Sequence, residues 1–80
     1  MTAVEVLRAF FGAGKLSTVD VSLKMGRNRS FLSAYLTRGN EPKVGLFAEI
    51  LDVIGYDLLM RKRDDGTEII LDPRPKEGDE

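Results

Sequence analysis

Up to residue 55, apolar residues recur at the spacing of amphipathic helices. Because an α-helix has about 3.6 residues per turn, side chains three or four positions apart share one face. Four such stripes occur: Val4, Leu7, Phe10 and Phe11; Leu16, Val21 and Met25; Phe31, Leu32, Tyr35 and Leu36; Val44, Phe47, Ala48, Ile50, Leu51 and Ile54. They predict four helices within residues 2–55. We expect the core to contain Val4, Leu7, Phe11, Val21, Leu32, Tyr35, Phe47, Leu51 and Ile54.

Polar and glycine residues mark the expected helix ends. Thr2 and Glu5 have the spacing of a capping box, and Ser17 with Asp20 repeats it before the second helix. Gly26 follows the second stripe, where glycine adopts the left-handed conformation that ends helices. The second helix is therefore expected at about residues 18–25 and the third within 28–38, with a tight turn between them.

After Gly55 the period changes to that of two extended runs, residues 56–63 and 67–71. Asp-Gly between such runs is a strong hairpin signal, so Asp65-Gly66 is expected to form a two-residue loop that pairs Arg63 with Glu68. The apolar side chains then fall on two faces: Leu58, Met60, Ile69 and Leu71 on one, and Leu59 and Ile70 on the other. We expect the first face to cover the helical core. The second, with Arg61, is expected to form a homodimer interface, because a free strand edge invites pairing.

These elements predict a mainly α fold in one domain, residues 1–72, with the β-hairpin at 56–72 and a flexible acidic tail at 73–80. The 80-residue chain has no Cys and no His, which excludes disulfides, thiolate or imidazole metal sites and Ser-His-Asp triads within it. We expect no enzymatic activity, no cofactor and no metal. No apolar run approaches the roughly 20 residues of a membrane span, so a cytoplasmic protein is expected.

The net charge of −1 hides an uneven distribution, because acids gather after residue 63. Between residues 15 and 43 only Asp20 and Glu41 oppose the cations Lys15, Lys24, Arg27, Arg29, Arg38 and Lys43. A basic segment of this kind attracts phosphate even in a chain that is nearly neutral overall.

The expected third helix, residues 28–38, divides into an apolar and a polar arc. The polar arc has a cation, hydroxyls and a methyl group but no large apolar side chain: Arg29, Ser30, Ser33, Ala34 and Thr37. Asn28 is expected to cap this helix by accepting from the amide of Ser30 or Phe31. The polar arc suits entry into a DNA groove.

Residues 18–36 resemble the motif of the lambda-repressor-like helix-turn-helix family, also called the XRE or Cro-type family, and the wider resemblance covers about residues 3–55. Gly26 stands at the family's turn glycine, with supporting apolar residues at Val21, Met25, Leu32 and Tyr35. Two positions depart from the pattern: Ser22 stands at the position of the usual small residue but is more polar than alanine, and Arg27 stands where an apolar residue is usual. The resemblance implies DNA binding by the third helix. The appended hairpin is similar to the Cro-like branch, in which a C-terminal strand mediates dimerisation.

A recognition helix lies in the major groove with its N-terminal part against base edges. We therefore expect base contacts from Asn28, Arg29, Ser30, Ser33 and Ala34. Phosphate contacts position such a helix from its ends and the neighbouring loop. We expect these contacts from Thr18, Arg27, Thr37, Arg38, Asn40 and Lys43.

Two functions remain open from the sequence. The first is sequence-specific binding of double-stranded DNA by a homodimer, as a small repressor of phage or prophage type acting at a palindromic operator. The alternative is a protein-binding module on the same scaffold, such as an antitoxin or a phage-encoded inhibitor of a host enzyme, because a fold does not fix a function. Salt-sensitive binding to duplex DNA would separate the two.

Overall fold

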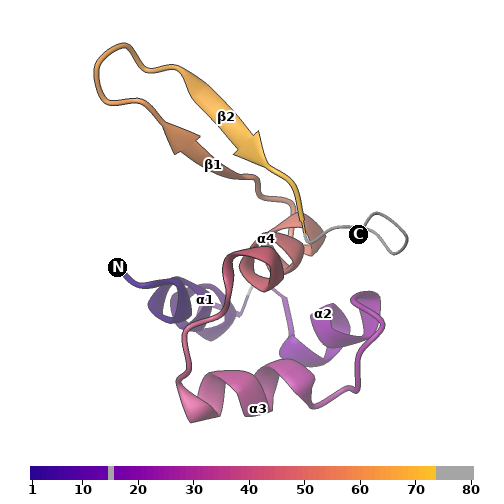
Figure 1. The fold of residues 1–80 in the computed structure, drawn as a ribbon. Coiled ribbons are helices and arrows are strands. Elements are labelled where there is room, and N and C mark those ends of the chain that lie inside the picture. The colour runs from indigo at the N-terminus through magenta and orange to yellow at the C-terminus, as the bar shows by residue number, and fades with distance from the viewer. Residues whose placement is uncertain (15, 74–80) are drawn as a thin grey trace. The chain divides into compact units, whose positions relative to one another are not determined.

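The structure is a computed structural model that describes residues 1–14 and 16–73. Its elements follow in the order α1 (Ala3–Gly12), α2 (Thr18–Lys24), α3 (Phe31–Arg38), α4 (Val44–Val53), β1 (Leu58–Arg61) and β2 (Glu68–Leu71) (Figure 1). The prediction of a mainly helical protein with four helices and a C-terminal β-hairpin is confirmed. Apart from Pro73, the expected acidic tail lies outside the described residues. The chain divides into two compact units, Met1–Lys43 and Val44–Glu80.

Local sequence signals set the starts of α1 and α2. The Thr2 hydroxyl accepts from the amide of Glu5 at 3.2 Å, and the Glu5 carboxylate accepts from the amide of Thr2 at 2.9 Å, so the expected capping box forms. The backbone hydrogen bond from Thr2 holds the pKa of the exposed Glu5 carboxyl below its ordinary value of 4.5. Ser17 caps α2 by accepting from the amide of Asp20 at 3.0 Å.

Gly26 ends α2 in the left-handed conformation, with a φ of 75°. The amides of Gly26 and Arg27 donate to the carbonyls of Leu23 and Ser22, each at 2.9 Å. These two bonds are the pattern of a Schellman cap. The tight turn predicted at Gly26 is therefore confirmed.

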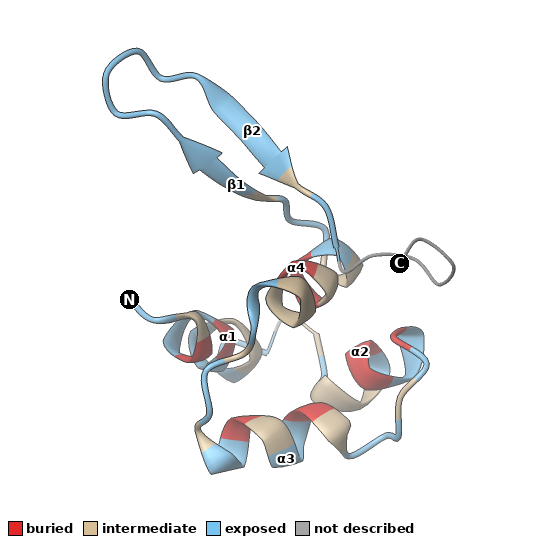
Figure 2. Cartoon of the chain, viewed as in Figure 1, coloured by how far each residue is buried: buried red, intermediate tan, exposed pale blue. Residues whose placement is uncertain are grey.

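The first unit buries one apolar face of each helix (Figure 2), and its buried apolar side chains are Val4, Leu7, Val21, Met25, Leu32 and Leu36. The expectation that Phe11 and Tyr35 belong to the core is wrong, because both are only half buried. Each ring lies beside another aromatic ring at the rim of the core. The centroid of Phe11 is 5.3 Å from that of Phe10, and the centroid of Tyr35 is 5.9 Å from that of Phe31.

In the second unit, the buried face of α4 is centred on Ile50, which has no exposed surface. Ala48 and Leu51 are buried beside it. Phe47 and Ile54, both expected in the core, are half buried. The buried stripe is therefore rotated towards Ile50 relative to the prediction.

The strands β1 and β2 pair antiparallel, with Arg61 opposite Glu68. The predicted pairing of Arg63 with Glu68 is wrong by two residues, because residues 63–66 form the loop between the last backbone pair, Lys62 and Thr67. A shift of two residues preserves the face on which each side chain lies. The predicted grouping of apolar residues therefore remains correct.

The longer loop has its own hydrogen bonds. The amide of Gly66, at a φ of 80°, donates to the carbonyl of Lys62 at 2.9 Å. The Asp65 carboxylate accepts from the amide of Thr67 at 2.9 Å, and this bond lowers the pKa of Asp65. Asp and Gly thus stabilise a four-residue turn here rather than the two-residue turn that their order suggested.

Candidate nucleic-acid interface

Helix α3 has a buried side and an exposed polar side (Figure 2). Leu32 has no exposed surface and Leu36 retains 9%. Ser33, Ala34 and Thr37 are exposed on the other arc. The arc predicted to face base edges is therefore accessible along the length of α3.

The residues before α3 are arranged differently from the prediction. The helix begins at Phe31, so Arg29 and Ser30 lie in the preceding turn and not in the first helical turn. Asn28 makes the expected bond, since its side-chain oxygen accepts from the Ser30 amide at 2.8 Å. It also accepts from the Ser30 hydroxyl at 2.7 Å. The turn is thereby closed, and it presents the exposed side chain of Arg29 at the N-terminal end of α3.

The N-terminus of α3 is capped from another helix. Ser30 occupies the cap position but makes no side-chain cap bond. Instead the hydroxyl oxygen of Ser22, a fully buried residue of α2, accepts from the amide of Leu32 at 3.1 Å. This bond satisfies one of the amides that a helix start leaves without an internal partner. Ser22 therefore fixes the start of α3 against α2.

The hydroxyl protons on the exposed arc are already used. Ser33 donates to the carbonyl of Ser30 at 3.2 Å, and Thr37 donates to the carbonyl of Ser33 at 2.7 Å. With these donors engaged, the lone pairs of each hydroxyl oxygen can still accept a hydrogen bond. Arg29 supplies donors beside them. In the major groove, acceptors match the amino groups of adenine and cytosine, and arginine matches guanine.

Two of the expected phosphate-contacting residues lie against aromatic rings. The guanidinium carbon of Arg27 lies 4.5 Å from the ring centroid of Phe31. That of Arg38 lies 5.9 Å from the ring centroid of Tyr35. From the sequence, Phe31 and Tyr35 were assigned only to the apolar arc. Hydrophobic periodicity identifies the face on which a ring lies, but it does not show that an arginine lies over that ring.

The other residues that are expected to contact phosphate lie near the start of α2, at the end of α3 and in the loop that follows α3. Thr37, Asn40 and Lys43 are exposed, and Thr18 is half buried as the first residue of α2. Glu41 lies within the same loop, but its carboxylate accepts from the amides of Val4 at 2.8 Å and Ala3 at 3.2 Å. A carboxylate at a helix N-terminus is favoured by the helix dipole.

The C-terminal end of α3 is held by α1. The Arg8 guanidinium donates to the carbonyl of Leu36 through Nε at 3.2 Å and Nη2 at 2.6 Å. A cation at this end satisfies a terminal carbonyl and complements the dipole. A Cβ at Gly39, which ends the helix at a φ of 76°, would lie 3.1 Å from the same Arg8 Nη2. Sequence reasoning missed Arg8 and the capping roles of Glu41 and Ser22, because no local pattern marks such partners.

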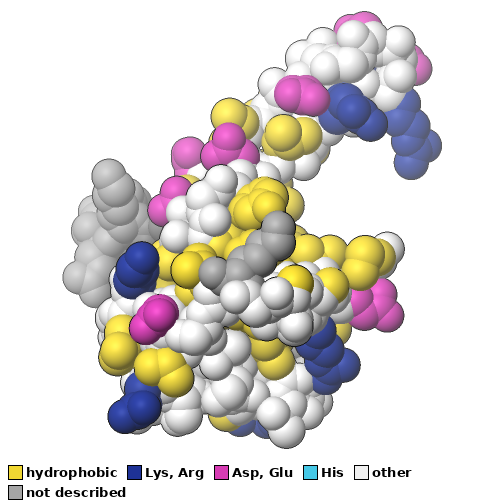
Figure 3. All heavy atoms as spheres, turned by 180° about the vertical axis from the view of Figure 1, so that it is seen from behind, with side chains coloured by type: hydrophobic (Ala, Val, Ile, Leu, Met, Phe, Trp, Pro, Cys, Tyr) yellow, Lys and Arg dark blue, Asp and Glu magenta, His cyan; other side chains and the backbone are white. Residues whose placement is uncertain are grey.

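Apolar side chains are exposed on both faces of the hairpin. Figure 3 shows exposed apolar side chains of the hairpin from one side. The expected interface residues Leu59 and Ile70 are directly paired and are 40% and 57% exposed, with Arg61 exposed two positions along the strand. The expectation that Met60 and Ile69 cover the core is wrong, since they are 55% and 53% exposed. Only Leu58 and Leu71, at the base of the hairpin, are half buried.

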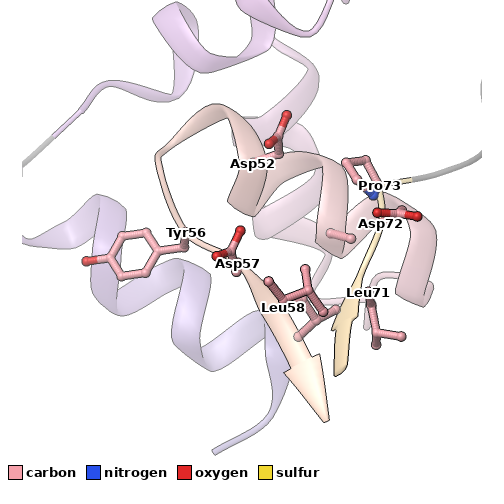
Figure 4. Close-up of a pocket in the computed structure, with 9 residues that line it drawn as sticks. Asp52, Tyr56, Asp57, Leu58, Leu71, Asp72 and Pro73 are labelled. Carbon is pink, nitrogen blue, oxygen red and sulfur yellow. The ribbon is translucent and has the colours of Figure 1, made fainter. Parts of the chain in front are cut away.

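A pocket lies at that base (Figure 4), and Asp52, Asp57 and Asp72 are among the residues that line it. No group of three Asp, Glu, His or Cys residues suited to a metal ion occurs in the part of the chain that the structure describes. The geometry assigns no ligand to this pocket.

Comparison with protein-family models, curated proteins and solved structures finds no match to this chain. Within residues 1–14 and 16–73, none of the helices is both long and apolar enough to cross a membrane.

Proposed function

We propose that this chain binds double-stranded DNA sequence-specifically, with α3 in the major groove, as a small transcriptional repressor of the lambda-repressor-like type. The observation that carries the proposal is the orientation of α3. Its large apolar residues Leu32 and Leu36 are buried, whereas its exposed arc holds only small and hydroxyl side chains. That arc lets the backbone approach base edges closely, and Arg29 stands at its N-terminal end.

The roles of the two exposed arginines differ under this proposal. Arg29 contacts a guanine edge, so Arg29→Ala is expected to cost about 1–3 kcal/mol at the best site and to relax preference at one base pair. Arg38 contacts a phosphate. Arg38→Ala is therefore expected to weaken binding to all sequences alike and to reduce the salt slope by about 0.9.

The experiment is a titration of labelled duplexes at two salt concentrations, with the best site first selected from random DNA. Arg63→Ala is the matched control, because Arg63 lies in the hairpin loop and has no assigned DNA contact. Absence of binding even at low salt would contradict the proposal. Identical behaviour of the Arg29 and Arg38 variants would contradict the division into base and phosphate contacts.

A homodimer is part of the same proposal. One recognition helix reads too few base pairs to define a genomic site, and two-fold pairing supplies a second half-site about one DNA turn away. The hairpin offers Leu59 and Ile70 on one face beside free strand edges, and Arg61 lies on the same face. A palindromic operator follows from this symmetry.

A second candidate is a protein-binding module on the same scaffold. The exposed pair Met60 and Ile69 favours it, because these side chains lie on the hairpin face opposite the proposed dimer interface. Apolar surface that serves neither the core nor a dimer is typical of a protein contact. Failure to bind DNA at low salt would favour this function.

A further inference from the structure

Four side chains along the flank of α3 form a continuous series of cation–ring and ring–ring contacts, in which the two rings are tilted by 45° to each other. Arg27 lies 4.5 Å from the Phe31 ring, Phe31 lies 5.9 Å from the Tyr35 ring, and Arg38 lies 5.9 Å from Tyr35. The series therefore runs cation, ring, ring, cation, and it begins before the first residue of α3 and ends at its last.

The two rings at the centre of the series are held in place. Both are half buried, and the Tyr35 hydroxyl donates to the carbonyl of Glu41 at 3.4 Å. A guanidinium over the face of a fixed ring is attracted by the ring quadrupole and loses part of its rotational freedom.

The series borders the arc proposed to read bases. At about 100° per residue, Phe31, Tyr35 and Arg38 fall within one narrow sector, with Leu32 on one side and Ala34 on the other. Because Arg27 precedes α3 and Arg38 is its last residue, the two guanidiniums belong to opposite ends of this helix.

We propose that Arg27, Phe31, Tyr35 and Arg38 form a ladder that holds two guanidiniums ready to bind DNA backbone phosphates at the two ends of α3. The inference rests on the proposed function and adds positioning roles for Phe31 and Tyr35. Phosphate oxygens accept paired N–H donors from arginine, and a guanidinium that is already oriented loses less entropy when it binds.

The test is a double-mutant cycle on DNA affinity with Arg27→Ala, Phe31→Leu and both together. Each single variant is expected to weaken binding about two- to fivefold, the effect of an exposed cation–ring contact. In the Phe31→Leu background, Arg27→Ala is expected to cost clearly less than in the wild type, because the orientation of Arg27 has already been lost. Arg38→Ala with Tyr35→Leu forms the second cycle.

Two controls separate positioning from general loss of structure. Phe11→Leu makes the same change at another half-buried ring outside the ladder and is expected to leave affinity and salt slope unchanged. In the free wild-type protein, NMR is expected to show ring-current shifts of the Arg27 and Arg38 side-chain protons. This measurement needs no variant that might fail to fold.

The outcomes distinguish the inference from the proposed function. Wild-type binding with coupled variants and shifted arginine protons supports the ladder. Wild-type binding with additive variants, or with unshifted arginine protons, overturns the ladder and leaves the proposed function standing. A wild type that does not bind DNA overturns both.

Discussion

A single buried hydroxyl connects the two helices of the proposed DNA-binding motif. Ser22 is fully buried, and its oxygen accepts from the amide of Leu32 at the start of α3. A local cap from Ser30 is missing, so this contact from α2 takes its place. The hydroxyl group of Ser22 therefore has a structural role that an apolar residue of similar size could not fill.

Ser22→Ala is expected to destabilise the protein by about 1–3 kcal/mol, because the buried amide of Leu32 loses its acceptor. Urea unfolding followed by circular dichroism measures the change. Ser33→Ala is the control, since Ser33 is exposed and bonds only within its own helix turn. Equal stability of the two variants would show that the Ser22 bond contributes nothing.

Glu5 makes the stability of the folded protein depend on pH through the N-terminal cap of α1. Its pKa is lowered in the folded protein by the amide of Thr2, so the unfolded chain binds a proton more readily. The contribution to stability is therefore complete above the ordinary pKa of 4.5 and is lost as the pH falls through the lower folded pKa. Stability measured between neutral and acid pH is expected to fall less in Glu5→Gln than in the wild type. An unchanged acid profile would contradict this role.

At the scale of elements, replacing glycine by alanine is expected to change stability in opposite directions at two positions. Gly26 has a φ of 75° and Gly12 is helical, and an added Cβ would meet no atom within 4 Å at either position. Gly26→Ala is expected to destabilise by about 1–2 kcal/mol through the left-handed backbone alone. Gly12→Ala is expected to stabilise by about 0.5–1 kcal/mol, because glycine weakens helices. Thermal unfolding of both variants checks the signs, and equal signs would contradict the assignment.

The hairpin shows which part of an element its sequence determines. Alternation of apolar and polar residues defines the two faces, and these were predicted correctly. Asp65-Gly66 is compatible with loops of two and of four residues, because both need Gly66 in the left-handed conformation. The hydrogen bonds of Asp65 with Thr67 and of Gly66 with Lys62 favour the longer loop, and neither is visible in a hydrophobic pattern.

At the scale of the whole molecule, whether a hydrogen bond can be predicted from the sequence depends on how far apart its two residues lie along the chain. Thr2 and Glu5 are three residues apart and were paired correctly. Glu41 bonds the amide of Val4 from 37 residues away, which no local rule can reveal. For the candidate site, residue exposure followed from helical periodicity. The start of α3 did not, because a closed turn at Asn28 precedes the helix.

The proposed dimer is tested by charge placed on one hairpin face. The double variant Leu59→Lys, Ile70→Lys is expected to be monomeric at micromolar concentration in sedimentation. Dimerisation of this variant would bury two unpaired charges from each copy in the interface. The matched control is Met60→Lys, Ile69→Lys on the opposite face, which is expected to dimerise like the wild type. A monomeric wild type that binds a palindromic site tightly would exclude the hairpin interface, as would a Leu59, Ile70 variant that still dimerises.

The capping of α3 and α1 by distant side chains has a consequence for evolution. Arg8 holds the last turn of α3, and Glu41 holds the first turn of α1. If α3 reads DNA, natural selection for a particular operator acts also on Arg8, although its guanidinium is engaged with a backbone carbonyl. Drift in α1 would then change operator preference without altering any residue that touches a base. In such a protein, operator specificity would depend on the residues that support α3 as well as on those of its exposed arc.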